Sequence, residues 1–206
     1  MGCAQTYVEP AQILTVPGAS VGRIVQAHPD RIAIAPFETA MQAAQGQIVV
    51  TSCGFLSFWQ DHLAACTDKP FIASALIAVP DLCQSLDPSQ ILTVTFDADS
   101  LSPAHFRGYP TDVVGLTPNM HLRQVISQNL TTLDVARAGR EIADLVAQAL
   151  RPHHKQILLE CTNLPPYREM IKARTDLPIT DILTCIETTR PGAINPQFLP
   201  HTHPDR

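Results

Sequence analysis

The sequence has few aromatic and few charged residues, and it lacks the patterns that mark several common functional classes. Aromatic residues make up 5% of the 206 positions, which argues against a surface that stacks nucleic-acid bases. The net charge is −5, so neither nucleic acid nor an anionic membrane is an expected partner. No run of eighteen apolar residues occurs, and the sequence therefore predicts no membrane span.

The patterns that would pair cysteines or hold a metal are also missing. None of the six cysteines falls in a C-x-x-C pair, the signature of thioredoxin-type and zinc-ribbon sites. No secretory leader is visible, and a chain of this length needs no disulfides, so we expect reduced thiols in a cytoplasmic protein. His153 and His154 adjoin in an expected turn, but no further ligand is placed near them, and we predict no metal site.

Short apolar runs alternate with helical patterns, which is typical of an α/β fold with a mainly parallel sheet. The expected strands are 12–16, 31–35, 47–51, 70–73, 91–95, 112–115, 156–160 and 178–180. The expected helices are 37–44, 55–66, 119–127, 133–150 and 166–174. We expect a first α/β lobe over 1–100, a second over 101–190, and a Pro-rich surface extension over 191–206.

The most informative pattern is a repeat around two cysteines. Cys53 and Cys161 each follow a buried apolar strand. Pro70 stands 17 residues after Cys53, Pro178 stands 17 after Cys161, and each proline begins another strand. Because ligands bind outside the carboxyl ends of parallel strands, two similar halves would bring both cysteines to a shared cleft.

Two opposed thiols can remove a proton from one face of a carbon and return one to the other face. Such a pair needs one thiolate and one thiol, and repulsion between two anionic sulfurs favours a shared proton. A helix beginning after each cysteine is expected to lower the thiol pKa and to hold a substrate carboxylate. The pattern therefore favours a cofactor-free racemase or epimerase. For the other cysteines we expect packing or incidental surface positions: Cys3, Cys66, Cys83 and Cys185.

Two acidic residues near these strands have simpler expected roles. Glu160 directly precedes Cys161 and is close enough to change its pKa, although a glutamate at a strand end more often faces solvent. Asp181 follows the second Pro-led strand, where an aspartate is expected to cap the next helix.

The segments around both cysteines resemble the aspartate/glutamate/hydantoin racemase superfamily. The resembling segments are 51–56, 70–76 and 158–167, and residues 91–101 are similar to the family's middle strand and turn. The resemblance covers residues 36–189. It implies two similar Rossmann-like lobes related by a pseudo-two-fold axis, chemistry without pyridoxal phosphate or another cofactor, and Cys53 and Cys161 as bases.

The resemblance also implies substrate contacts beside these cysteines. The residues concerned are Ser52, Gly54, Thr162 and Asn163, together with Thr95 on the middle turn. Family members usually carry a substrate-contacting Asn near an N-terminal Pro-Gly turn. Here Pro17-Gly18 keeps the turn without a nearby Asn, which leaves the substrate open.

The expected substrate is an amino acid or another small carboxylic acid. A homodimer is the assembly that we consider. Close alternatives are a one-cysteine decarboxylase of arylmalonate-type acids and a cis–trans isomerase of maleate-type diacids. A non-catalytic protein that binds small acids is the alternative from another class. Two cysteines favour the racemase, because decarboxylation needs only one proton donor.

Overall fold

The computed structural model describes residues 3–199 as an α/β structure with two parallel sheets. The smaller sheet pairs β1 (Val49–Val50) with β2 (Phe71–Ile72). The larger sheet has the order β4-β3-β5-β6. Its strands are β3 (Ile91–Thr95), β4 (Asp112–Gly115), β5 (Gln156–Leu159) and β6 (Ile179–Asp181). All four strand pairings are parallel, which confirms the predicted fold class.

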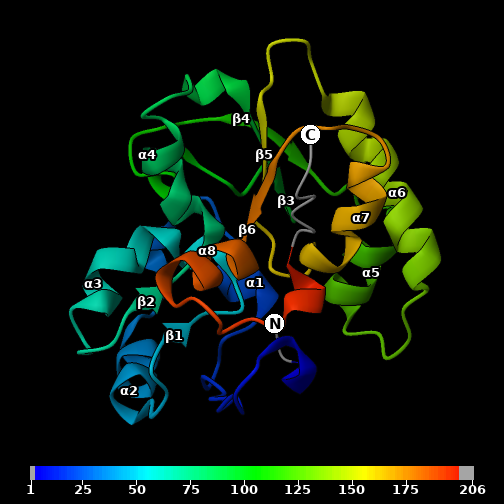
Figure 1. The fold of residues 1–206 in the computed structure, drawn as a ribbon. Coiled ribbons are helices and arrows are strands. Elements are labelled where there is room, and N and C mark those ends of the chain that lie inside the picture. Colours follow the sequence, from blue (N-terminus) through cyan, green and yellow to red (C-terminus); the bar gives the residue numbers. More distant parts are fainter. Residues whose placement is uncertain (1–2, 200–206) are drawn as a thin grey trace.

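Helices precede, connect and follow these strands (Figure 1). Their bounds are α1 (Val21–Ile24), α2 (Ala35–Ala43), α3 (Gln60–Ala64), α4 (Val79–Leu82), α5 (His121–Gln128), α6 (Val135–Ala149), α7 (Arg168–Lys172) and α8 (Ile182–Thr189). In Figure 1, α5, α6 and α7 lie together on one side of the larger sheet, and β1, β2, α2 and α3 lie on the other. The longest helix, α6, is capped by Asp134, whose side chain accepts the N–H of Arg137.

The central strands of the larger sheet, β3 and β5, are buried on both faces. Ile157 and Leu159 of β5 join the apolar cluster beneath α5, α6 and α7. Leu158 lies between them in sequence and joins the other cluster, together with β1, β2 and α8. Side chains alternate along a strand, so one continuous apolar run supplies both clusters.

The repeated sequence pattern has a counterpart in the strand register. In β1 and β2, Val49 is paired with Phe71. In β5 and β6, Ile157 is paired with Ile179, at the same separation along the chain. Each strand pair therefore closes a unit of equal length, and a cysteine follows the first strand of each unit.

Several sequence predictions differ from the observed elements. Segments 12–16 and 31–35 form no strands: residues 12–16 have no regular secondary structure, and residues 31–35 run from the 3-10 helix Pro29–Arg31 into α2. β3 belongs to the larger sheet, with β4, β5 and β6. The segment after Pro191 is no simple surface extension, since Ile194 is buried and bridges to Tyr7. Residues 200–206 of that extension lie outside the described part.

Candidate active site

Cys53 stands between β1 and the 3-10 helix Gly54–Trp59, in an extended conformation. The Thr51 hydroxyl fixes this turn, since it accepts the Cys53 N–H at 3.3 Å and donates to the Ala73 carbonyl at 2.6 Å. Ala73 directly follows β2. The turn is therefore held at the carboxyl end of the smaller sheet, where its sequence pattern predicted it.

Cys161 occupies the matching place in the second unit, two residues after the end of β5. Its carbonyl accepts the N–H of Leu164 at 3.0 Å, which turns the chain into the 3-10 helix Pro165–Tyr167 and then α7. Cys161 is only 7% exposed, whereas Cys53 is half-buried. All six cysteines are free thiols, as expected.

The two cysteine turns touch each other in a reciprocal way. The Thr162 hydroxyl, after Cys161, donates to the carbonyl of Ser52, before Cys53, at 2.6 Å. Gly54, after Cys53, packs against Glu160, before Cys161, so closely that a Cβ at Gly54 would lie 2.1 Å from Glu160 Oε1. These contacts bring the two units together at their cysteines, and each thiol is close enough to Glu160 for its charge to act on the thiol pKa.

Glu160 is a buried carboxyl group between the two turns, not the solvent-facing residue expected from sequence. It is 1% exposed, and its Oε2 accepts the hydroxyl of Thr95 at 2.7 Å. Oε1 has no hydrogen-bond partner within residues 3–199. Burial raises the pKa of Glu160 to about 7, and the hydrogen bond from Thr95 only partly offsets this.

Burial favours the protonated form of both thiols. Burial, together with the nearby charge of Glu160, raises the pKa of both cysteines to about 12. Backbone N–H groups of Phe55 and Asn163 act in the opposite direction but do not outweigh burial. The expectation that helix N-termini would lower these pKa values is therefore wrong. The cysteines precede short 3-10 helices, and desolvation is the largest cause of each shift.

A cavity of about 700 Å³ opens onto Cys53. Its walls include the N-terminal segment over residues 9–16, α2, the smaller sheet, and Arg190 at the end of α8. Ser52 also lines it, whereas Cys161 does not belong to its lining within the described residues. Arg190 is a cation that the sequence did not reveal as part of the site. Its guanidinium lies 3.5 Å from the Glu9 carboxylate.

The other predicted substrate contacts divide into two groups. Thr95 and Thr162 are buried, and their hydroxyls donate to Glu160 and Ser52 respectively. Asn163 is exposed, although its amide acts on the pKa of Cys161.

Asp181 caps α8 as predicted, accepting the N–H groups of Leu183 and Thr184.

Two groups of side chains outside this site have the composition of metal ligands. Asp112 stands beside His153 and His154, the histidines for which the sequence indicated no third ligand. Glu38, His62 and Cys66 form the other group.

None of the helices within residues 3–199 combines the length and apolar character needed to cross a bilayer.

The comparisons with known proteins found similar sequences among dimethylsulfoniopropionate lyases. No family model matches the chain. Dimethylsulfoniopropionate lyase 7 of Emiliania huxleyi is 29% identical over 173 residues, covering 75% of this chain and 50% of that protein. The dimethylsulfoniopropionate lyase of Durusdinium sp. clade D is 28% identical over 169 residues, covering 75% of this chain and 56% of that one. This chain spans about half the length of these curated relatives.

Two solved structures are similar to this one at low sequence identity. A glutamate racemase from Bacillus anthracis has a TM-score of 0.48 and 13% identity, covering 74% of this chain and 61% of that chain. A glutamate racemase from Francisella tularensis in complex with D-glutamate has a TM-score of 0.47 and 11% identity, covering 83% of this chain and 63% of that one.

Proposed function

We propose that this protein is an enzyme that removes a proton from the carbon next to a carboxylate, with Cys53 and Cys161 as its acid–base groups. We further propose that the reaction is an elimination on a sulfonium acid of the dimethylsulfoniopropionate type. The observation that carries the proposal is the reciprocal contact of two cysteine turns around the buried carboxyl group of Glu160. The similarity to dimethylsulfoniopropionate lyases supports elimination as the outcome.

The charges around the thiols favour a substrate that carries its own positive charge. The charged group that raises the pKa of both thiols is the acid Glu160. Among the described residues, no cation lowers the pKa of either thiol. A sulfonium or ammonium group in the cavity would favour the thiolate and offset its desolvation. This arrangement disfavours purely anionic diacids, which were the alternative substrates considered from sequence.

The elimination balances without a cofactor. The Cys53 thiolate takes a proton from the carbon next to the carboxylate, and the bond between the β-carbon and sulfur breaks. The electron pair of that bond leaves with dimethyl sulfide, and acrylate remains. Water then takes the proton from Cys53. Arg190, which lines the same cavity as Cys53, is our candidate for holding the substrate carboxylate.

The direct test is to supply dimethylsulfoniopropionate and measure dimethyl sulfide in the headspace and acrylate in solution. We expect the two products in equal amounts, and loss of both in Cys53→Ser. The matched control is Cys83→Ser, which changes a thiol outside the site and should leave turnover unchanged. A folded protein that forms neither product would contradict the elimination.

Racemisation is the second candidate, and the pairing of the two thiols is the observation that favours it. Protonation of the carbanion from the opposite face needs a second acid, and Cys161 lies in the turn that touches the Cys53 turn. Incubation of an amino-acid panel in D₂O distinguishes the outcomes. Deuterium at Cα with inversion and without loss of a β-substituent indicates a racemase. Loss of the β-substituent indicates a lyase.

A further inference from the structure

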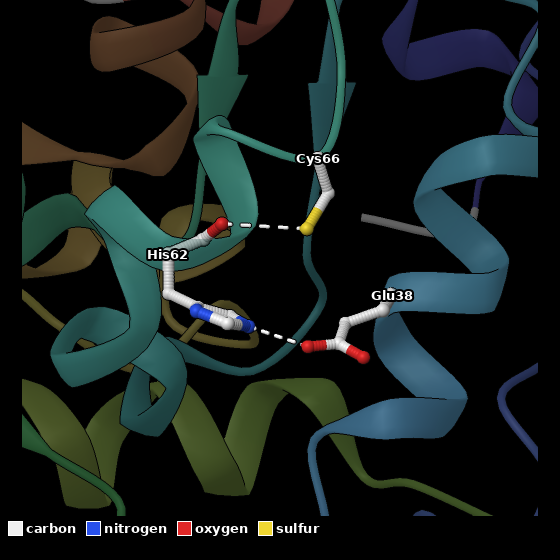
Figure 2. A group of neighbouring side chains, drawn as sticks. All are labelled: Glu38, His62 and Cys66. Carbon is white, nitrogen blue, oxygen red and sulfur yellow. Dashed lines mark hydrogen bonds and ion pairs between the residues drawn. The ribbon is translucent and has the colours of Figure 1, made fainter.

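A glutamate, a histidine and a cysteine meet between α2 and α3, outside the candidate active site (Figure 2). Glu38 lies on α2, His62 on α3, and Cys66 two residues after the end of α3. His62 and Cys66 are four positions apart, so they share one face of this helical segment. Figure 2 shows the Glu38 carboxylate reaching across to the His62 ring. We propose that these three side chains form a zinc site that ties α2 to α3.

The distances are close to those that zinc requires. His62 Nε2 lies 2.5 Å from Glu38 Oε1, and Cys66 Sγ donates to the His62 carbonyl at 3.4 Å. The three ligand atoms all lie within 4.8 Å of one another. Around tetrahedral zinc, bonded at about 2.0 Å to N and O and about 2.3 Å to S, they would stand roughly 3.3 to 3.6 Å apart. Small side-chain rotations reach that arrangement.

The donor set selects zinc over the commoner hard cations. Mg²⁺ and Ca²⁺ prefer oxygen ligands, whereas a thiolate with an imidazole suits zinc. The Cys66 thiolate and the Glu38 carboxylate together neutralise a divalent ion. Three protein ligands leave the fourth tetrahedral position for water.

Binding would move protons in a defined way. The Cys66 thiol proton goes to solvent, because the thiolate is the ligand. The proton of neutral His62 moves from Nε2 to Nδ1, which frees the Nε2 lone pair for zinc. One proton is therefore released for each zinc bound to the neutral-histidine form, and no oxidant or reductant is needed.

In the other group of possible metal ligands, which contains Asp112 and His153, a hydrogen bond fixes the tautomer of the third member, His154. His154 Nδ1 accepts the N–H of Arg151 at 3.0 Å, so its Nε2 carries the ring proton and donates to Asp112 at 3.1 Å. A metal at His154 Nε2 would have to break the bond from Arg151. Within residues 3–199, no hydrogen bond to His62 Nδ1 competes with the tautomer that zinc needs.

The location gives the zinc a structural role beside the candidate active site. α2 contributes Phe37 and Met41 to the cavity wall. α3 follows directly on the 3-10 helix Gly54–Trp59 after Cys53, and Gln60 at its start is hydrogen-bonded to both Phe71 and Ala73 at 2.8 Å. A zinc between α2 and α3 would hold one wall of the cavity to the segment that follows Cys53.

The test is metal binding by the full chain after removal of metals with a chelator. Zinc is titrated against a chromophoric chelator, and cobalt is used as a spectroscopic substitute. We expect one zinc per chain and a near-ultraviolet thiolate-to-cobalt band. Cys66→Ser should abolish that band, and Cys66→Ser and His62→Asn should each weaken zinc binding by about 100-fold or more. Zinc should also raise the melting temperature of the unmodified protein but of neither variant.

Matched controls separate this site from other thiols and histidines. Cys83→Ser and His153→Asn should bind zinc as the unmodified protein does, and so should Cys53→Ser, which removes a candidate catalytic thiol. The proposal is overturned by zinc binding that survives in both Cys66→Ser and His62→Asn, or is lost in Cys53→Ser. It is equally overturned if the unmodified protein binds no zinc below about 100 μM. If Cys66→Ser does not fold, His62→Asn and Glu38→Gln decide the outcome by the same titration.

Discussion

The two cysteine-bearing units share one local design but differ in their surroundings. In the first unit, β1 and β2 have two residues each and form their own small sheet, and Cys53 borders a cavity of about 700 Å³. In the second unit, β5 and β6 belong to the four-stranded sheet, and Cys161 is buried with the apolar residues beneath α6 and α7. The thiol of the first unit is therefore open to a ligand in the cavity, whereas the thiol of the second unit is buried.

This difference predicts unequal roles for the two thiols. Cys53→Ser should lower elimination by about 1,000-fold, because serine is a far weaker acid and cannot serve as the base. Cys161→Ser should lower the rate of elimination much less, but it should abolish racemisation of any amino-acid substrate. With such a substrate, each variant should retain slow Cα exchange of a different enantiomer. The measurements are product formation and deuterium exchange. Equal losses of elimination in both variants would show that the units are functionally equivalent.

The close packing between the units predicts a strong effect of a single methyl group. Gly54→Ala places a Cβ 2.1 Å from Glu160 Oε1 and 2.6 Å from the Glu160 carbonyl, and a backbone atom cannot rotate away. We expect a loss of about 3 kcal/mol in the free energy of unfolding, measured with denaturant. The control is Gly22→Ala in α1, where an added Cβ meets nothing within 4 Å and should be neutral or slightly stabilising. Similar stabilities of the two variants would mean that the turns separate easily.

The raised pKa of Glu160 predicts that the free energy of unfolding depends on pH. Its pKa is about 7 in the folded protein, against an ordinary value of 4.5, so below about pH 4.5 it is protonated in both states and costs nothing. As the pH rises to about 7, the unfolded chain ionises first, and the folded state loses up to about 3 kcal/mol. Glu160→Gln removes this loss and should be more stable than the unmodified protein above pH 7.

The difference in melting temperature between Glu160→Gln and the unmodified protein should be small at pH 4.5 and reach its full size near pH 7. Glu160→Gln should also speed alkylation of Cys53 above pH 7, followed by mass spectrometry of its peptide, because the neighbouring negative charge is gone. Glu169→Gln, which changes an exposed glutamate on α7, is the control for loss of charge alone. A constant difference from pH 4.5 to 8 would show that Glu160 does not titrate between the cysteines.

The fold could be predicted from sequence where short apolar runs stand between turn residues. The observed bounds of β3 and β4 are those predicted, because both strands lie in the larger sheet and are flanked by polar and proline-rich turns. Segments 12–16 and 31–35 have a similar apolar composition but form no strands, since the first has no regular structure and the second joins a 3-10 helix to α2. Apolar composition alone therefore does not identify a strand.

The site was only partly predictable, because its key contacts join distant parts of the chain. The two cysteines were visible from their repeated spacing, but Glu160 was expected to face solvent. Strand alternation could have corrected this, since Glu160 lies two positions after Leu158, which points into the buried interface with the first unit. His62 and Cys66 were not recognised as a pair, although they stand four positions apart, and Glu38 joins them only through the packing of α2 on α3.

The smallest predicted effect concerns the hydrogen bond that joins the two units. Thr162→Val removes the hydroxyl that donates to the Ser52 carbonyl at 2.6 Å, while keeping the shape of the side chain. We expect a loss of about 1 to 2 kcal/mol in the free energy of unfolding, because an acceptor that is partly buried loses its donor. Thr188→Val is the matched control, since its hydroxyl donates to Thr184 on the exposed face of α8 at 2.9 Å and should cost less. Turnover should fall together with stability only in Thr162→Val, because only that bond sets the position of one cysteine turn against the other. Unchanged turnover in a destabilised Thr162→Val would separate the stability of this contact from the alignment of the thiols, and it would favour a reaction that needs Cys53 alone.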